Sequence, residues 1–396
     1  MSLLDTRYIG VLGIVAILLI AYLFSNNRKK ISFKLVGNAL LMQFLLAFFI
    51  LKTAPGRFLF KKLAAGFSRV YEFATAGSEF VFGTGPWAMI FAIKVASIII
   101  FFGALMSVLF HLGIIQVAVR VVSFLVRPLL GTSGAETLCA AANSMLGQTE
   151  APLLIKHYLE KMTTSEILVV MVSGMGTLSG AILAVYGSIG VPMMHLLSAS
   201  VMAIPGSILI SKILLPETEK PETVGKKQVD MKSNSKNILD AITTGTTDGL
   251  GLAVNVLAML ITFISLIAMI NYILSYVGFY TLNDIFSAFF GPFAFLLGVP
   301  KIDTQSAGAL LGQKLVINEF VAYSSMVNFA ITEKTKIILT YALAGFSNFS
   351  CIGIQIGGIG AIAPKSRDTL VKLGMRALLG GTLTNFLNAA IASLLI

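Results

Sequence analysis

Two glutamates lie within strongly apolar segments, which makes them the first candidates for chemistry. Glu150 falls in the segment 131–162 and Glu319 in the segment 301–331. A charged side chain at membrane depth costs roughly 2.5 to 3.5 kcal/mol or more unless a partner or a cavity compensates it. A structural ion pair or a helix cap would also compensate the charge. Because each half of the chain carries one such acid, the pattern favours contact with a polar substrate or a coupling cation. We expect both acids to be buried around one hollow.

Each glutamate precedes a polar, glycine-bearing interruption of an apolar run by a similar distance. Glu150 precedes the cluster 174–177 (Gly-Met-Gly-Thr) by 24 to 27 residues, and Glu319 precedes the cluster 345–348 (Gly-Phe-Ser-Asn) by 26 to 29. Glycines alone would also suit close helix packing, but packing does not require their polar neighbours. Unpaired backbone groups at such breaks are tolerated where a cavity, an ion or a substrate satisfies them. Paired interruptions in two halves therefore predict a transporter binding site near the bilayer midplane.

The chain as a whole has the composition of a membrane protein. Hydrophobic residues make up 56% of it and charged residues only 12%, against roughly a quarter charged in soluble domains. A helix of roughly 20 apolar residues crosses a bilayer, and apolar runs of this kind predict eight spanning helices. These are 8–25, 33–52, 88–111, 165–187, 190–212, 253–277, 336–359 and 370–395.

Loop charges set the expected topology. The net charge of +11 comes from Lys and Arg concentrated in short segments between apolar runs, which indicates topology determinants rather than nucleic-acid binding. If the basic segments lie in the cytoplasm, the N-terminus lies outside. The parity of the helices then requires 131–162 to enter and leave from the cytoplasm and 301–331 to do so from outside. We therefore predict two re-entrant hairpins of opposite orientation, as in an inverted repeat.

Four further segments complete the predicted all-α integral membrane fold. Basic residues within apolar sequence indicate that 54–80 and 112–130 are helices lying in the membrane interface. The stretch 237–252 is too interrupted to span. Segment 213–236 is polar and contains proline, which predicts a solvated cytoplasmic loop between the two halves. The sequence contains no HExxH, GxSxG or phosphate-loop pattern, so no enzymatic activity is predicted.

Three motifs, in order along the chain, resemble those of the concentrative nucleoside transporters. They are GQTEAPL at 147–153, NEFVAY at 318–323 and GFSNFSCIG at 345–353. The likeness extends from about residue 85 to the C-terminus. It implies a secondary active symporter without a cofactor, a homotrimer that imports nucleosides by alternating access across the bacterial inner membrane. A passive channel and a membrane-embedded enzyme are the competing classes.

The resemblance also implies that each subunit has a scaffold and a mobile transport domain. The scaffold consists of 1–111 and 237–279. The transport domain consists of 112–212, with hairpin 131–162 and broken helix 165–187, and of 280–396, with hairpin 301–331 and broken helix 336–359. The substrate would sit between the hairpin tips and the helix breaks.

The same resemblance implies which residues meet the nucleoside. Those on the nucleobase side are Gly147, Gln148, Thr149, Glu150 and Ile182. Those on the ribose side are Glu319, Phe346, Asn348 and Cys351. A carboxylate can accept two hydrogen bonds from the sugar hydroxyls, so a nucleobase without ribose should bind poorly. Many members of the family have Ser at the position of Cys351, and a thiol is a weaker partner than a hydroxyl.

Sodium coupling is the expectation for the co-transported ion. Sodium-coupled members resemble this chain at Asn143 and at Thr177, and the carbonyls of Leu146 and Leu178 would complete an oxygen cage. Several bacterial members that couple to protons lack the asparagine, so proton coupling remains the alternative. The expected partners are a nucleoside, the lipid bilayer and further copies of the chain, without nucleic acid.

Overall fold

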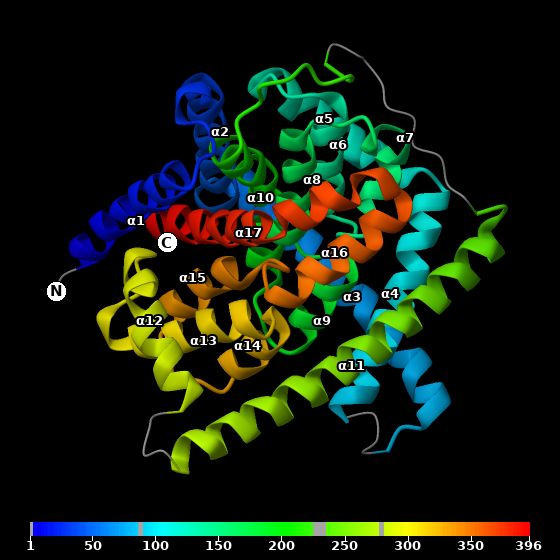
Figure 1. The fold of residues 1–396 in the computed structure, drawn as a ribbon. Coiled ribbons are helices and arrows are strands. Elements are labelled where there is room, and N and C mark those ends of the chain that lie inside the picture. Colours follow the sequence, from blue (N-terminus) through cyan, green and yellow to red (C-terminus); the bar gives the residue numbers. More distant parts are fainter. Residues whose placement is uncertain (1–2, 86–89, 225–234, 277–280) are drawn as a thin grey trace.

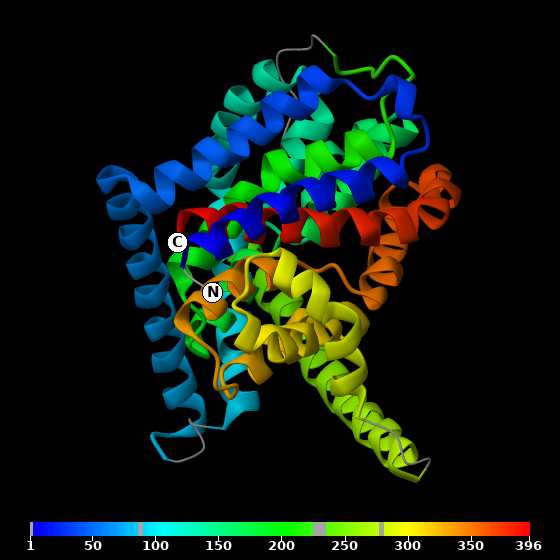
Figure 2. The same cartoon turned by 90° about the vertical axis from the view of Figure 1, so that its left-hand side faces the viewer.

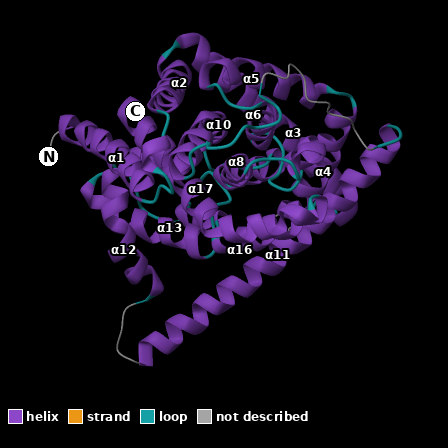
Figure 3. Ribbon diagram, turned by 45° about the horizontal axis from the view of Figure 1, so that its top comes forward, coloured by secondary structure: helices purple, strands orange, loops and turns teal. Residues whose placement is uncertain are grey.

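The computed structural model describes residues 3–85, 90–224, 235–276 and 281–396, and within these ranges it contains helices and no strand (Figure 3). The all-α prediction is therefore confirmed for the described residues. Three predicted features fall partly outside these ranges: the first residues of helix 88–111, the end of helix 253–277 and positions 225–234 of the predicted loop.

Long helices make up the N-terminal part of the chain. They are α1 (Leu3–Leu23), α2 (Phe33–Lys52), α3 (Ala54–Phe82) and α4 (Phe91–His111), and the short η1 (Arg28–Lys30) lies between α1 and α2. Ser32 begins α2 by accepting a hydrogen bond from the Leu35 amide, and Thr53 caps α3 in the same way through Gly56. The segment predicted to be an interfacial helix, 54–80, is one continuous helix that runs along a side of the molecule (Figure 2).

The first of the two predicted halves contains short helices around a turn. Its elements are α5 (Ile114–Leu130), α6 (Gly134–Asn143), η3 (Ala151–Ile155), α7 (Lys156–Leu159), α8 (Thr164–Gly176), α9 (Gly180–Ser188) and α10 (Met193–Leu214). The segment 131–162 folds back on itself, since α6 packs against η3. The predicted helix 165–187 is broken at 177–179, which overlaps the end of the predicted cluster 174–177.

The second half begins with one long helix, which shorter helices follow. Its elements are α11 (Ile238–Tyr276), α12 (Leu282–Leu296), η4 (Lys301–Asp303), α13 (Thr304–Val316), α14 (Glu319–Met326), α15 (Glu333–Leu343), α16 (Phe349–Ile362), η5 (Pro364–Ser366) and α17 (Arg367–Leu395). α13 and α14 pack against each other around a short turn, and the predicted helix 336–359 is broken at 344–348.

One expectation about an interrupted stretch is wrong. The glycine-bearing segment 237–252 is not separate from the predicted helix 253–277, because nearly all of it forms the first part of the 39-residue helix α11. The glycines serve packing instead: a Cβ at Gly245 would lie 2.6 Å from the carbonyl oxygen of Gly103, and one at Gly249 would lie 2.9 Å from the Cα of Ile100. α11 and α4 therefore approach each other closely along this glycine face.

Six of the described helical spans are long and apolar enough to cross a membrane by length and composition, and one of them is counted across the break between α8 and α9. They are Phe33–Lys52, Ala92–His111, Thr164–Ser188, Met193–Leu214, Ile238–Tyr276 and Pro364–Leu395. The count of eight predicted from sequence includes two further segments. Of these, 8–25 has a shorter apolar helix, Tyr8–Leu23, and 336–359 is divided into α15 and α16 by five residues.

The buried centre of the molecule consists of α8, α10 and α17, which contact one another (Figure 1). In the α8–α9 and α17 spans 94% and 89% of the apolar window is buried, against 11% in α11. Apolar side chains on α11, such as Ile261 and Ile264, are exposed. A surface of this kind is stable against lipid or another protein, not against water.

The described part of the predicted solvated loop is docked rather than free. Thr223 is buried, and its hydroxyl accepts a hydrogen bond from the Ala135 amide at 3.1 Å, in the first turn of α6. Glu217 accepts one from the Thr163 hydroxyl at the start of α8 and pairs with Lys212 at 3.2 Å. The polar composition of 213–236 therefore reflects in part contacts with an amide in the first turn of α6 and with the side chain of the residue that caps α8.

Candidate functional site

The two helix breaks touch each other at the centre of the molecule. The Phe346 amide donates a hydrogen bond to the carbonyl of Thr177 at 3.3 Å, so the break of the second half joins that of the first. Gly345 permits the approach, since a Cβ there would lie 2.7 Å from the carbonyl oxygen of Met175. The polar interruptions that the sequence placed in separate halves form one contact.

Asn385 of α17 ties the two breaks together with one fully used amide. Its Nδ2 donates to the carbonyls of Gly176 at 2.8 Å and Ala344 at 2.9 Å, at the ends of the two half-helices. Its Oδ1 accepts from Lys314 at 2.6 Å and from the Ser347 hydroxyl at 3.2 Å. Carbonyls that the breaks leave without helical partners are thus satisfied by a buried side chain.

Glu319 is buried, as its sequence context predicts, and both halves hold its carboxylate. Tyr186 of α9 donates its hydroxyl to Oε1 at 2.9 Å, and Asn348 of α16 donates Nδ2 to Oε2 at 3.1 Å. Asn318 positions the glutamate by capping α14 through the Val321 amide. The carboxylate retains further lone-pair positions for a polar ligand.

Gln148 is linked to Glu319 through three successive hydrogen bonds. Its Nε2 donates to Cys351 Sγ at 3.3 Å, and the Cys351 amide donates to Asn348 Oδ1 at 3.1 Å. Asn348 then donates to Glu319. One predicted residue from the nucleobase side and three from the ribose side are therefore brought into one chain of polar contacts.

Gln355 of α16 orients the Gln148 amide, and sequence reasoning missed it. Its Nε2 donates to Gln148 Oε1 at 3.0 Å and to the Met171 carbonyl at 3.0 Å. Gly174 makes room for the pair, since a Cβ there would lie 2.7 Å from Gln355 Nε2. The available signal was a single glutamine in the apolar stretch of α16 that follows Ser350.

Glu150 differs from expectation because its side chain is exposed rather than buried. It ends the tight turn between α6 and η3, and its Oε2 accepts a hydrogen bond from the Gly147 amide at 3.1 Å. Thr149 packs instead toward α16, where a Cβ at Gly358 would lie 2.6 Å from its methyl carbon. The turn places three successive side chains in different surroundings, which apolar flanks alone do not reveal.

Ile182 and Phe346 lie beside this network. Ile182 is buried on α9, one helical turn before Tyr186 and hence on the same face of that helix. Phe346 is half-buried within the second break. Ile182 is thus close to Tyr186, and Phe346 lies two residues before Asn348, and both of these polar residues donate to Glu319. Apolar side chains beside a few polar groups are typical of a small-molecule site.

Two of the predicted sodium ligands, Asn143 and Thr177, lie at the carbonyl end of α8, where both contact Ser173. Asn143 ends α6, and its Nδ2 donates to the Ser173 hydroxyl at 2.9 Å. Its buried Oδ1 has no hydrogen-bond partner among the described residues. The Thr177 hydroxyl donates to the Ser173 carbonyl at 2.7 Å, which leaves its oxygen able to accept or coordinate. Leu146 and Leu178 are buried nearby in sequence.

An unsatisfied buried amide oxygen costs about 1 to 3 kcal/mol, and a cation would remove this penalty at Asn143. Among the described residues no group of three or more His, Cys, Asp or Glu could hold a metal ion. The donors at this place are neutral oxygens, the type that hard cations prefer. The residues therefore fit a sodium ion.

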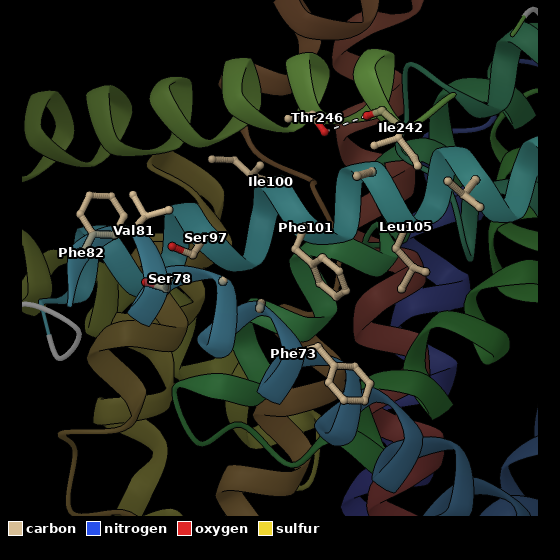
Figure 4. Close-up of a pocket in the computed structure, with 14 residues that line it drawn as sticks. Phe73, Ser78, Val81, Phe82, Ser97, Ile100, Phe101, Leu105, Ile242 and Thr246 are labelled. Atoms are coloured by element: carbon tan, nitrogen blue, oxygen red, sulfur yellow. Dashed lines mark hydrogen bonds between the residues drawn. The ribbon is translucent and has the colours of Figure 1, made fainter. Parts of the chain in front are cut away.

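A cavity of about 620 Å³ lies elsewhere, between α3, α4 and α11 (Figure 4). Its wall is apolar, with Phe73, Phe101 and Leu105 among its lining residues and few hydroxyl groups. None of the predicted site residues lines it. A nucleoside carries several hydrogen-bonding groups, and the apolar wall of this cavity offers them few partners, so the cavity does not suit a nucleoside.

Comparison with known proteins gives the class of the chain. Three family profiles match it: Na+ dependent nucleoside transporter N-terminus over residues 12–85, nucleoside recognition (Gate) over 92–193, and Na+ dependent nucleoside transporter C-terminus over 195–393. The chain is 43% identical to an uncharacterized transporter of Haemophilus influenzae, over 98% of this chain and 97% of that protein. It is 37% identical to the nucleoside permease NupC of Helicobacter pylori, with the same coverage.

A solved structure has the same fold. CNTnw in an inward-facing substrate-bound state superposes with a TM-score of 0.93 at 37% identity, covering 98% of both chains. A variant of CNTnw in an outward-facing state matches with a TM-score of 0.92. The apolar helices and the shared fold define a multi-pass membrane transporter. The chain belongs to the family of Na+-dependent nucleoside transporters.

Proposed function

We propose that this chain imports nucleosides together with Na+ by alternating access. The observation that carries the proposal is the buried Glu319 carboxylate, held by Tyr186 from one half and Asn348 from the other. A polar network that needs both hairpins and both helix breaks is suited to opening toward either side when the elements move. The structures of CNTnw in an inward-facing state and of its variant in an outward-facing state support this mechanism.

The ribose would bind at the Glu319 end of the network. Glu319 accepts hydrogen bonds from the sugar hydroxyls and Asn348 orients the carboxylate, while Phe346 packs against the sugar. Cys351 contributes less, because a thiol is a weak partner and its sulfur already accepts from Gln148.

The nucleobase would bind at the Gln148 end. The Gln148 amide can both donate and accept, and Gly147, Thr149 and Ile182 would line this side. The exposed Glu150 would contact the base through water or from the open side of the site.

Sodium is the proposed coupling ion, bound by Asn143, Thr177 and the carbonyls of Leu146 and Leu178. The free Oδ1 of Asn143 supports this assignment, and so does the description of the family. Proton coupling is the weaker alternative.

The larger organisation is proposed from the resemblance. The segments 131–162 and 301–331 are re-entrant hairpins of an inverted repeat, and the N-terminus lies outside a bacterial inner membrane. The scaffold is 1–111 with 237–279, and the transport domain moves against it in a homotrimer. The exposed apolar face of α11 supports contact of the scaffold with lipid or with neighbouring subunits.

Uptake into proteoliposomes tests the function. Purified protein is expected to accumulate labelled uridine above the external concentration under an inward sodium gradient, and to release it chemically intact. Uracil should be taken up poorly. Equilibration without accumulation would indicate a channel, and altered label would indicate an enzyme. Undiminished accumulation with choline in place of sodium at fixed pH would refute the sodium site and leave nucleoside transport in place.

A further inference from the structure

Lys314 is a buried lysine at the break of the second half. It lies in the last turn of α13, is 1% exposed, and donates from Nζ to the Ala342 carbonyl at 2.9 Å and to Asn385 Oδ1 at 2.6 Å. Both acceptors are neutral oxygens. The Ala342 carbonyl belongs to the last turn of α15, so the ammonium sits at the negative end of that half-helix.

The first half has the same arrangement with a different residue. Asn143 lies at the end of hairpin helix α6 and donates to the Ser173 hydroxyl in the last turn of α8. Lys314, at the end of α13, donates to the Ala342 backbone carbonyl in the last turn of α15. The two residues differ in the groups that remain available for a further contact. Asn143 presents an oxygen without a partner, whereas Lys314 brings a positive charge and no acceptor.

Both places are joined by one side chain. Asn385 donates to the Gly176 carbonyl, which ends α8, and accepts from the Lys314 ammonium. It also accepts from Ser347, next to Asn348 in the substrate network. The Asn385 amide therefore contacts both helix breaks, so a charge at either break acts on the same side chain.

We propose that the ammonium of Lys314 is a resident cation that fills, in the second half, the place that the coupling ion takes in the first. The break of α15–α16 needs no ion from solution, and a single exogenous cation accompanies each nucleoside. The proposal rests on the proposed function in that it assumes a cation-coupled nucleoside carrier. It assigns Lys314 and Asn385 as positioning residues, since neither is placed against the substrate.

The first test uses the unaltered protein. The reversal potential of uridine current in proteoliposomes gives the number of charges moved per nucleoside, whether sodium or protons are carried. One charge per uridine is expected. Two or more would overturn the resident-cation proposal while leaving nucleoside transport intact, whereas a complete lack of uridine transport would instead refute the proposed function.

The second test removes the ammonium. Lys314→Ala opens space that a sodium ion can enter, and Lys336→Ala, on α15 with its ammonium paired to the exposed Glu333, is the matched control. At low sodium Lys314→Ala should weaken uridine binding by about tenfold, the loss expected for a cation at a helix terminus. Rising sodium should restore binding, with the Hill coefficient for sodium increasing from about 1 to about 2.

Two results of the second test would overturn the proposal. Unchanged binding at low sodium would mean that the charge is not needed, and a loss that sodium does not relieve would mean that Lys314 acts only as a structural donor. If Lys314→Ala fails to insert into the membrane, the charge ratio of the unaltered protein decides the question. The control variant should bind uridine as the unaltered protein does.

Discussion

The amide of Asn348 joins the start of α16 to the carboxylate of Glu319. Its Oδ1 accepts from the Cys351 amide at 3.1 Å as the helix cap, and its Nδ2 donates to Glu319 Oε2 at 3.1 Å. The residue that ends the second break thus also orients the acid on the second hairpin. Movement of α16 relative to α14 would change the direction of the carboxylate.

Glu319→Gln should weaken uridine binding by about 10- to 100-fold without preventing insertion. Glutamine keeps the volume and can still accept from Tyr186, but it loses the charge and one acceptor that the ribose hydroxyls need. A hydrogen bond to a charged group contributes about 1.5 to 3 kcal/mol, or about 10- to 100-fold in affinity. Binding of labelled uridine measures this, with the exposed Glu333→Gln as control. Normal uptake by Glu319→Gln would remove the central site assignment.

Tyr186→Phe should weaken binding less than Glu319→Gln. It removes one donor to Oε1 and leaves the ring packing in place, so the carboxylate remains but is less well oriented. The expected loss is about 1 kcal/mol, or roughly fivefold. Tyr323→Phe is the matched control, because that ring lies against Tyr186 but its hydroxyl donates to the Thr340 carbonyl. Equal effects of the two variants would indicate general destabilisation rather than a role at Glu319.

Gln355→Met should alter the choice of base more than the affinity for ribose. Without Gln355 the Gln148 amide loses the donor that fixes its orientation, so either end of the amide can face the base. The ratio of uridine to adenosine affinities should shift severalfold, while the preference for uridine over uracil persists. Competition binding against labelled uridine measures both. A variant that lowers all affinities alike would place Gln355 in the packing and not in recognition.

The sequence predicted the helical class, the two breaks and the burial of Glu319, because apolar context and polar interruptions are local features. It did not predict Tyr186, Gln355 or Asn385, which reach the site from distant elements. The exposure of Glu150 depends on a tight turn closed by its own bond to Gly147. The continuity of α11 depends on contacts with α4, since glycines that resemble helix breaks are contact points there.

Asn143→Leu should remove the dependence of uridine binding on sodium. Leucine keeps the volume but takes away the buried Oδ1, the one side-chain oxygen at this place that lacks a partner among the described residues. Binding in the presence of sodium should fall to the level seen in choline. Asn328→Leu, at an exposed asparagine after α14, serves as the control. Preserved stimulation by sodium in Asn143→Leu would move the ion site elsewhere.

Asp303 joins the base of the second hairpin to the start of α15. Its carboxylate should make the free energy of unfolding depend on pH in the acidic range. The buried carboxylate accepts from the Thr332 amide at 3.1 Å and from the hydroxyls of Thr332 and Thr335 at 2.6 Å each. Burial alone would raise the pKa of Asp303, but these hydrogen bonds outweigh it and lower the pKa below its usual value.

Because the pKa of Asp303 is lower in the folded state, its stabilisation is complete above the unfolded pKa of about 3.9 and is lost as pH falls through the folded value. Asp303→Asn should therefore destabilise the protein at pH 7, by about 1.5 to 3 kcal/mol. The difference between variant and unaltered protein should stay constant from pH 5 upward and shrink below pH 4. Thermal unfolding in detergent from pH 3 to 8 measures it, and a difference that does not shrink in acid would show that hydrogen-bond geometry, and not charge, holds the hairpin to α15.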